Sequence, residues 1–132
     1  AVMFAFDLVK HLDMPLQMEF IRLSSYGSGF STSGKVNAVD IKLPDLNDKN
    51  VLIVEDIVDT GLTAKFLMDF MHCNFNAKSI KFCSLLDKKI TRKVDIEPDY
   101  YGFEVDNKFV VGYGLDYEGY YRNLRYIGYK EI

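Results

Sequence analysis

An apolar run at 51–54, Val-Leu-Ile-Val, constrains the fold of this chain more than any other feature. Short runs of β-branched and aliphatic residues are typical of strands buried on both faces of a parallel sheet. The run ends in two carboxylates, Glu55 and Asp56, and helix-forming residues begin soon afterwards. We therefore predict a strand over 51–55 with both acids at its end, then a turn, then a helix over 62–73.

The turn between this strand and this helix has the composition of a phosphate site. Gly61 lets the backbone approach a ligand closely, and N–H groups at the start of a helix bind anions. The groups that could bind a phosphate monoester belong to Thr60, Gly61, Leu62 and Thr63. Carboxylates suit sugar hydroxyls, a metal ion or a proton instead. Because ligands of open α/β sheets bind at the carboxyl ends of the strands, this order predicts a ribose 5-phosphate site.

The rest of the chain alternates between strand and helix patterns. We expect a helix over 1–12, strands over 17–23, 36–43, 79–86, 100–105 and 108–113, and a tail over 114–132 with a short helical turn and a final strand. Residues 24–34 are dominated by Ser and Gly and predict a mobile loop. This alternation implies a single α/β domain with a mostly parallel sheet flanked by helices.

Composition limits the classes of function. The 132 residues are 48% hydrophobic and 27% charged, which is typical of a soluble globular domain. A net charge of −3 argues against broad binding to nucleic acid or anionic membranes. No apolar run approaches the ~20 residues of a membrane-spanning helix. Cys73 and Cys83 are predicted to be core thiols, and His11 and His72 surface residues. We expect a cytoplasmic protein whose partners are small molecules, without nucleic acid or membrane.

Two motifs resemble the type I phosphoribosyltransferases, and the second narrows the resemblance to the hypoxanthine-guanine branch. The first is the strand and turn at 51–63. The second is Phe-Val-Val-Gly-Tyr-Gly-Leu-Asp-Tyr at 109–117, followed by Tyr-Tyr-Arg-Asn-Leu at 120–124. The resemblance spans 1–132 and implies that family's α/β fold, with a small hood-like, base-binding part at the C-terminus. It also implies one domain that lacks the family's N-terminal helix and strand and its first pyrophosphate loop.

The resemblance implies an enzyme of purine salvage. Such enzymes transfer the 5-phosphoribosyl group of phosphoribosyl pyrophosphate to hypoxanthine or guanine, use Mg²⁺, and occur as homodimers or homotetramers. The products are IMP or GMP and pyrophosphate. By this resemblance Glu55 and Asp56 accept hydrogen bonds from the ribose hydroxyls and could also hold metal. The turn over 60–63 holds the 5′-phosphate.

Asp59 is predicted to accept a proton. In the resembling purine-specific enzymes, the matching Asp removes the N7 proton of the base. A free Asp has a pKa of ~4, which is too low for an efficient base near neutrality. We expect burial and the neighbouring Glu55 and Asp56 to raise it. Asp59 could also cap the following helix, and the two roles are compatible.

The same resemblance assigns residues to the base and to pyrophosphate. Lys88 would donate to the 6-oxo group of the base, although chemistry alone leaves Lys89 as a near-equal candidate. The other assignments are Ile57, Phe109 and Val110 to the base, Asp116 to Mg²⁺, Arg122 to pyrophosphate, and Ser25 and Tyr26 to a loop that closes over pyrophosphate.

Three alternatives fit the residues less well. A regulator that senses phosphoribosyl pyrophosphate without catalysis would have a decayed base pocket and a basic face, whereas the candidate residues are present and the net charge is negative. A receiver domain would leave the Asp-Thr-Gly-x-Thr turn at 59–63 without a role. A P-loop would require Gly-Lys-Ser/Thr, which this turn does not contain.

Overall fold

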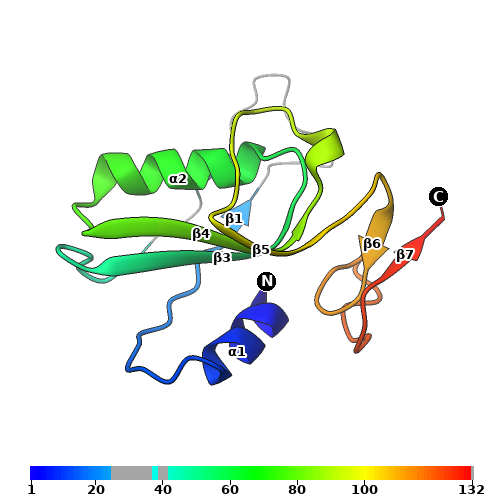
Figure 1. Cartoon of the computed structure of the whole chain (residues 1–132), viewed down its shortest axis with the longest axis horizontal. Helices are drawn as coiled ribbons and strands as arrows, with labels where there is room; N and C mark the ends of the chain where they lie inside the picture. Colours follow the sequence, from blue (N-terminus) through cyan, green and yellow to red (C-terminus); the bar gives the residue numbers. More distant parts are fainter. Residues whose placement is uncertain (25–36, 39–41, 132) are drawn as a thin grey trace.

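The computed structural model describes residues 1–24, 37–38 and 42–131 (Figure 1). Its elements are α1 (Val2–Lys10), β1 (Leu23–Ser24), β2 (Asn37–Ala38), β3 (Asn50–Val58), α2 (Leu62–Asn74), β4 (Ser79–Asp87), the 3₁₀ turn η1 (Lys89–Thr91), β5 (Tyr100–Glu104), β6 (Phe109–Val111) and β7 (Gly128–Lys130). Ser25 and Tyr26 of the predicted loop lie outside the described residues.

The main sheet has three parallel strands in the order β3-β4-β5, which confirms the predicted α/β class. Val58 pairs with Asp87, and Asp87 pairs with Glu104, so the carboxyl ends of the three strands form one row. Helix α2 covers one face of the sheet, and α1 lies against the opposite face (Figure 1). The loops that follow β3, β4 and β5 therefore all leave from the same edge.

The core lies between the sheet and α2. Phe82 on β4 is 1% exposed and packs with Val58 of β3 and Ala64 of α2. Half-buried Ile96 packs against this cluster from the loop between η1 and β5. That loop is thus fixed to the core, on the side of the sheet where the strands end.

Strand β3 is longer than predicted. The parallel ladder with β4 continues through Glu55↔Ser84 to Val58↔Asp87. Glu55 and Asp56 therefore lie inside the strand, and the prediction that they end it is wrong. The ladder pairs the backbone whatever the side chain, so the carboxylates do not stop it.

The predicted strands over 17–23 and 36–43 are reduced to short pieces in the described residues. Only Leu23–Ser24 and Asn37–Ala38 pair, as a small antiparallel ladder separate from the main sheet. Residues 12–22 form neither helix nor strand, and Phe20 among them is exposed. Their alternating pattern finds no backbone partner in the part of the chain that the structure describes.

The C-terminal part forms a two-stranded antiparallel unit beside the main sheet, made of β6 and β7 (Figure 1). The predicted final strand is present, but residues 114–131 contain no helical turn. Tight turns replace it, closed by the bridges Gly112↔Leu115 and Tyr117↔Tyr120. Positive φ angles at Tyr113, Glu118 and Tyr121 are compatible with these turns and not with a helix.

Two smaller predictions have mixed outcomes. Cys83 is buried as expected, whereas Cys73 is exposed near the end of α2, so its prediction as a core thiol is wrong. His11 and His72 are exposed as predicted. Among the described residues, no helix has the length and apolar character needed to cross a membrane.

Candidate active site

The turn that links β3 to α2 depends on Gly61. Its φ of +82° is unfavourable for residues with a Cβ, and a Cβ there would lie 2.7 Å from both Arg92 Cδ and Ile96 Cγ2. Gly61 is also the N-cap of α2, so the prediction that Asp59 caps this helix is wrong. No side chain caps α2, which leaves N–H groups of its first turn able to bind an anion.

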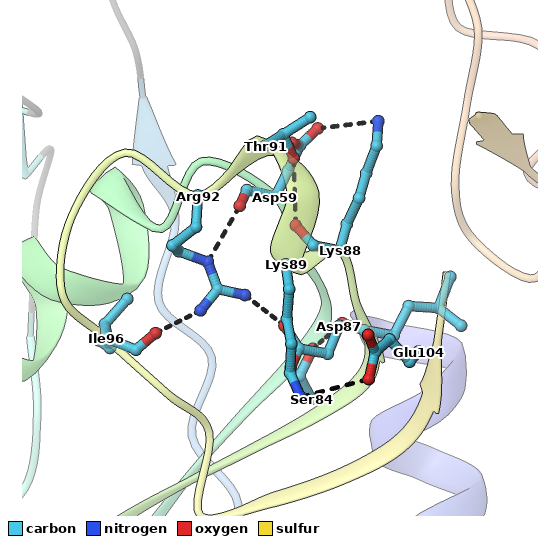
Figure 2. A network of polar contacts seen from close by, with 10 residues as sticks. Asp59, Ser84, Asp87, Lys88, Lys89, Thr91, Arg92, Ile96 and Glu104 are labelled. Carbon is cyan, nitrogen blue, oxygen red and sulfur yellow. Dashed lines mark hydrogen bonds and ion pairs between the residues drawn. The ribbon is translucent and has the colours of Figure 1, made fainter. Parts of the chain in front are cut away.

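Asp59 is accessible, contrary to the predicted burial. Its side chain is 48% exposed, because it follows the last residue of β3 and extends beyond the sheet edge. The carboxylate accepts a hydrogen bond from the Thr91 hydroxyl, and Lys88 Nζ lies 3.7 Å from Oδ2 (Figure 2). A carboxylate that is oriented by neighbours yet reachable can accept a proton from a ligand.

Glu55 is a carboxyl with a raised pKa. Burial in β3, and secondarily the negative charge of Asp56, raise the pKa of Glu55 to about 7, against a weaker opposing effect of the Ala1 amino group. Asp56 accepts the N–H of Ile57 at 2.8 Å, and its other oxygen is 3.0 Å from the Ala1 amino group. Successive strand residues point to opposite faces, so the two acids would bind separate groups.

Lys88 and Lys89 differ in burial and in partners. Lys88 is 8% exposed, and its backbone N–H donates to Val58 O at 2.9 Å, which fixes it beside the end of β3. Lys89 is exposed, and its ion pair with Glu104 at 3.2 Å raises its pKa. Lys88 therefore lies beside Asp59 and the end of β3, whereas Lys89 pairs with Glu104 on β5.

A pocket of about 470 Å³ brings Lys88 together with Phe109. The whole lining is Lys88, Asn107, Lys108, Phe109, Tyr129, Lys130 and Glu131. Phe109 packs edge-to-face on Tyr117, with ring centroids 5.5 Å apart. Ile57 and Val110 are half-buried and do not line this pocket. The β7 residues were missed from the sequence, because only the pairing Phe109↔Lys130 brings them here.

Asp116 and Arg122 lie together in the C-terminal unit. Arg122 Nη2 is 3.1 Å from Asp116 Oδ1, and the Gly119 N–H donates to Asp116 Oδ2 at 2.8 Å. Arg122 Nη1 also donates to Gly114 O at 2.6 Å. Among the described residues, no hydrogen bond or ion pair joins this pair to Asp59.

The described carboxylates suit a metal ion shared with a ligand. Within 1–24, 37–38 and 42–131, no group of three His, Cys, Asp or Glu residues could hold a metal ion. Mg²⁺ prefers oxygen ligands and is often bound by one or two carboxylates together with substrate phosphates. Asp116 has such oxygens at the end of a turn, and a metal ion there would share them with Arg122 and the Gly119 N–H.

Sequence reasoning missed Asp87, Thr91 and Arg92. These residues connect the end of β4 to the turn after β3 through the hydrogen bonds in Figure 2. Charged residues follow the predicted strand at 79–86, but nothing in the sequence indicates that they reach back to Asp59. That contact depends on the parallel pairing of β3 with β4.

The family model of the phosphoribosyl transferase domain matches residues 1–118. The chain belongs to the phosphoribosyltransferase family. This phosphoribosyltransferase is 48% identical to the hypoxanthine-guanine phosphoribosyltransferase of Bacillus subtilis (strain 168) over 97% of its own length and 71% of that protein's. Identity and coverage are the same for the enzyme of that name from Streptococcus pneumoniae (strain ATCC BAA-255 / R6).

A solved structure supports the same assignment. The hypoxanthine phosphoribosyltransferase of Staphylococcus aureus superposes with a TM-score of 0.90 at 41% identity, over 98% of this chain and 70% of that one. These comparisons confirm the type I fold and the resemblance to the hypoxanthine-guanine branch.

Proposed function

We propose that this phosphoribosyltransferase acts in purine salvage. It transfers the 5-phosphoribosyl group from phosphoribosyl pyrophosphate to hypoxanthine or guanine, giving IMP or GMP and pyrophosphate. One observation carries the proposal: Lys88 lines a pocket with Phe109 and also lies 3.7 Å from the carboxylate of Asp59, which begins the phosphate-binding turn. The pocket and the turn are thus linked by the ion pair between Lys88 and Asp59.

The sugar phosphate binds along the end of β3. The N–H groups and hydroxyls of Thr60, Gly61, Leu62 and Thr63 hold the 5′-phosphate, supported by the uncapped N-terminus of α2. Glu55 and Asp56, the acids of β3, accept hydrogen bonds from different ribose hydroxyls, because successive strand residues point to opposite faces. Both roles follow the resemblance.

The purine base binds beside Asp59 and loses its N7 proton there. Purine N9 bonds to ribose C1′ while the bond from C1′ to the pyrophosphate oxygen breaks, and the N7 proton passes to the Asp59 carboxylate. Lys88 donates to the 6-oxo group and Phe109 stacks on the ring, and the resemblance assigns Ile57 and Val110 to the base as well, outside the pocket lined by Lys88 and Phe109. Holding both reactants in line supplies a large part of the rate enhancement.

Pyrophosphate is stabilised from the C-terminal unit and the loop. Arg122 contacts the leaving pyrophosphate, and Asp116 would hold Mg²⁺ bound to it. When bound, that ion would supply charge neutralisation at the leaving oxygen. Ser25 and Tyr26 lie outside the described residues, and their role in excluding water, which would otherwise hydrolyse the activated ribosyl group, is implied by the resemblance alone.

We further propose that the protein works in the cytoplasm as a homodimer or homotetramer, with small molecules as its substrates. The relatives named above carry the names of enzymes of this reaction, which supports catalysis over the alternative of a regulator. Such a regulator would bind phosphoribosyl pyrophosphate without consuming it.

The test is formation of IMP and GMP from phosphoribosyl pyrophosphate with Mg²⁺, followed by chromatography. We expect product from at least one base, and none when Mg²⁺ is removed with a chelator. Binding of phosphoribosyl pyrophosphate without turnover of hypoxanthine or guanine would contradict the proposal and favour the regulator.

A further inference from the structure

We propose that Arg92 is a positioning residue, which holds the turn at 59–61 in the shape that binds the 5′-phosphate. The inference rests on the proposed function of that turn. Arg92 does not touch substrate in this account. It acts through the backbone of the turn.

The guanidinium of Arg92 joins three separate parts of the chain (Figure 2). Nη2 donates to the carboxylate of Asp87 at the end of β4, and Nη1 donates to the carbonyl of Ile96 in the following loop. Nε donates to the carbonyl of Asp59 at 3.2 Å. The planar fork of Arg can serve three acceptors at fixed angles, which the single ammonium of Lys cannot do.

The same segment contacts each residue of the turn. The aliphatic part of Arg92 lies directly against Gly61: its Cδ is 2.7 Å from the position that a Cβ on Gly61 would take. The Lys93 N–H donates to Thr60 O at 2.8 Å. Asp59 and Thr60 therefore each accept a hydrogen bond from residue 92 or 93, and Gly61 lies directly against the Arg92 side chain, so the shape of the turn depends on where Arg92 sits.

Asp87 forms an ion pair with Arg92 at the end of β4. Asp87 is 0% exposed, and Arg92 is its ion-pair partner, with a side chain only 11% exposed. Within the described residues, Asp87 Oδ2 has no hydrogen-bond partner. Removing Arg92 alone would leave a buried carboxylate without a counter-charge, which is strongly destabilising. A test of positioning must therefore neutralise Asp87 as well.

The experiment compares the double variant Asp87→Asn/Arg92→Met with Asp87→Asn alone and with the unchanged protein. Steady-state kinetics of IMP formation give kcat and separate KM values for phosphoribosyl pyrophosphate and hypoxanthine, and a thermal melt confirms folding. In the double variant we expect KM for phosphoribosyl pyrophosphate to rise about tenfold or more and kcat to fall, because the turn is no longer held. KM for hypoxanthine should change less than about twofold.

Asp87→Asn is the matched control, because the amide oxygen can still accept from Arg92 Nη2 while Arg92 keeps its bonds to Asp59 and Ile96. We expect its KM for phosphoribosyl pyrophosphate to stay within about threefold of the unchanged protein. A folded double variant with an unchanged KM for phosphoribosyl pyrophosphate would overturn the proposal and show that Arg92 serves only as the counter-charge of Asp87. Equal losses for both substrates would also overturn it, since they indicate general damage to the site.

Arg92→Lys keeps the test decisive if the double variant does not fold. It retains a positive charge against Asp87 but loses the fork, so we expect a folded protein with KM for phosphoribosyl pyrophosphate raised about fivefold or more. An unchanged KM in this variant would overturn the proposal. If the unchanged protein forms neither IMP nor GMP, the proposed function itself has failed, which is a distinct result.

Discussion

Glu55 and Asp59 are four residues apart and differ in their exposure to solvent. Glu55 sits inside β3, where burial raises its pKa to about 7. Asp59 lies past the end of the strand, half-exposed, with Lys88 and Thr91 at its carboxylate. The sequence predicted a buried Asp59 because it appeared to share a strand end with two other acids. The ladder instead continues to Val58 and separates it from them.

The raised pKa of Glu55 makes stability depend on pH. A carboxyl whose folded pKa lies above its unfolded value of 4.5 disfavours the folded state once it ionises, so stability is greatest below about pH 4.5 and is lost as pH rises through about 7. Between pH 5 and pH 8 the loss from this group is roughly 2–3 kcal/mol. Urea unfolding at both pH values should show that Glu55→Gln reduces the fall by this amount. Equal falls in both proteins would contradict the pKa assigned to Glu55.

The two neighbouring lysines provide a matched pair of variants. Lys88→Met should raise KM for hypoxanthine about tenfold or more, because a charged donor to the 6-oxo group is lost. Lys89→Met removes an exposed lysine paired with Glu104 and should leave that KM within about twofold. Steady-state kinetics with hypoxanthine varied would decide between them. A larger effect at Lys89 would show that the wrong lysine has been placed in the pocket.

At the scale of elements, the sequence predicted the bounds of three well. Strands at 79–86 and 100–105 and the helix at 62–73 appear within a residue of their expected bounds. Apolar residues of β4 and α2 face the core around Phe82, whereas every residue of β5 is exposed and that strand is fixed by its pairing with β4. The strand expected at 17–23 failed, since alternation alone does not supply a pairing partner.

The turn before α2 is the element on which the phosphate site depends. Gly61→Ala should destabilise the protein by about 2 kcal/mol and raise KM for phosphoribosyl pyrophosphate, because a Cβ meets Arg92 and Ile96 at a positive φ. Thermal melts and kinetics measure both effects.

Gly119→Ala is the control for Gly61→Ala. Gly119 has nearly the same φ, +83°, but a Cβ there meets nothing within 4 Å. It should therefore show the cost of the backbone angle without the clash. Equal losses of stability in the two variants would mean that the clash of a Cβ at residue 61 with Arg92 adds nothing to the cost of the backbone angle.

At the scale of the whole molecule, the site is assembled from segments that only the tertiary fold brings together. The motif at 51–63 predicted the phosphate turn and its acids, and the motif at 109–117 predicted the base pocket by resemblance. Neither predicted that β7 lines the pocket or that Arg92 reaches the turn. Both contacts depend on long-range strand pairing, β6 with β7 and β3 with β4, which one sequence does not specify.

In the proposed reaction, Asp59 accepts the purine N7 proton as the phosphoribosyl group is transferred. The most direct test of this step is kcat for IMP formation in Asp59→Asn, beside Asp69→Asn, which changes an exposed acid of α2 paired with Lys65. Loss of the base should lower kcat by about 100-fold or more. Asp69→Asn should stay within about twofold. Asp59→Asn that keeps wild-type kcat, while binding both substrates, would contradict this account.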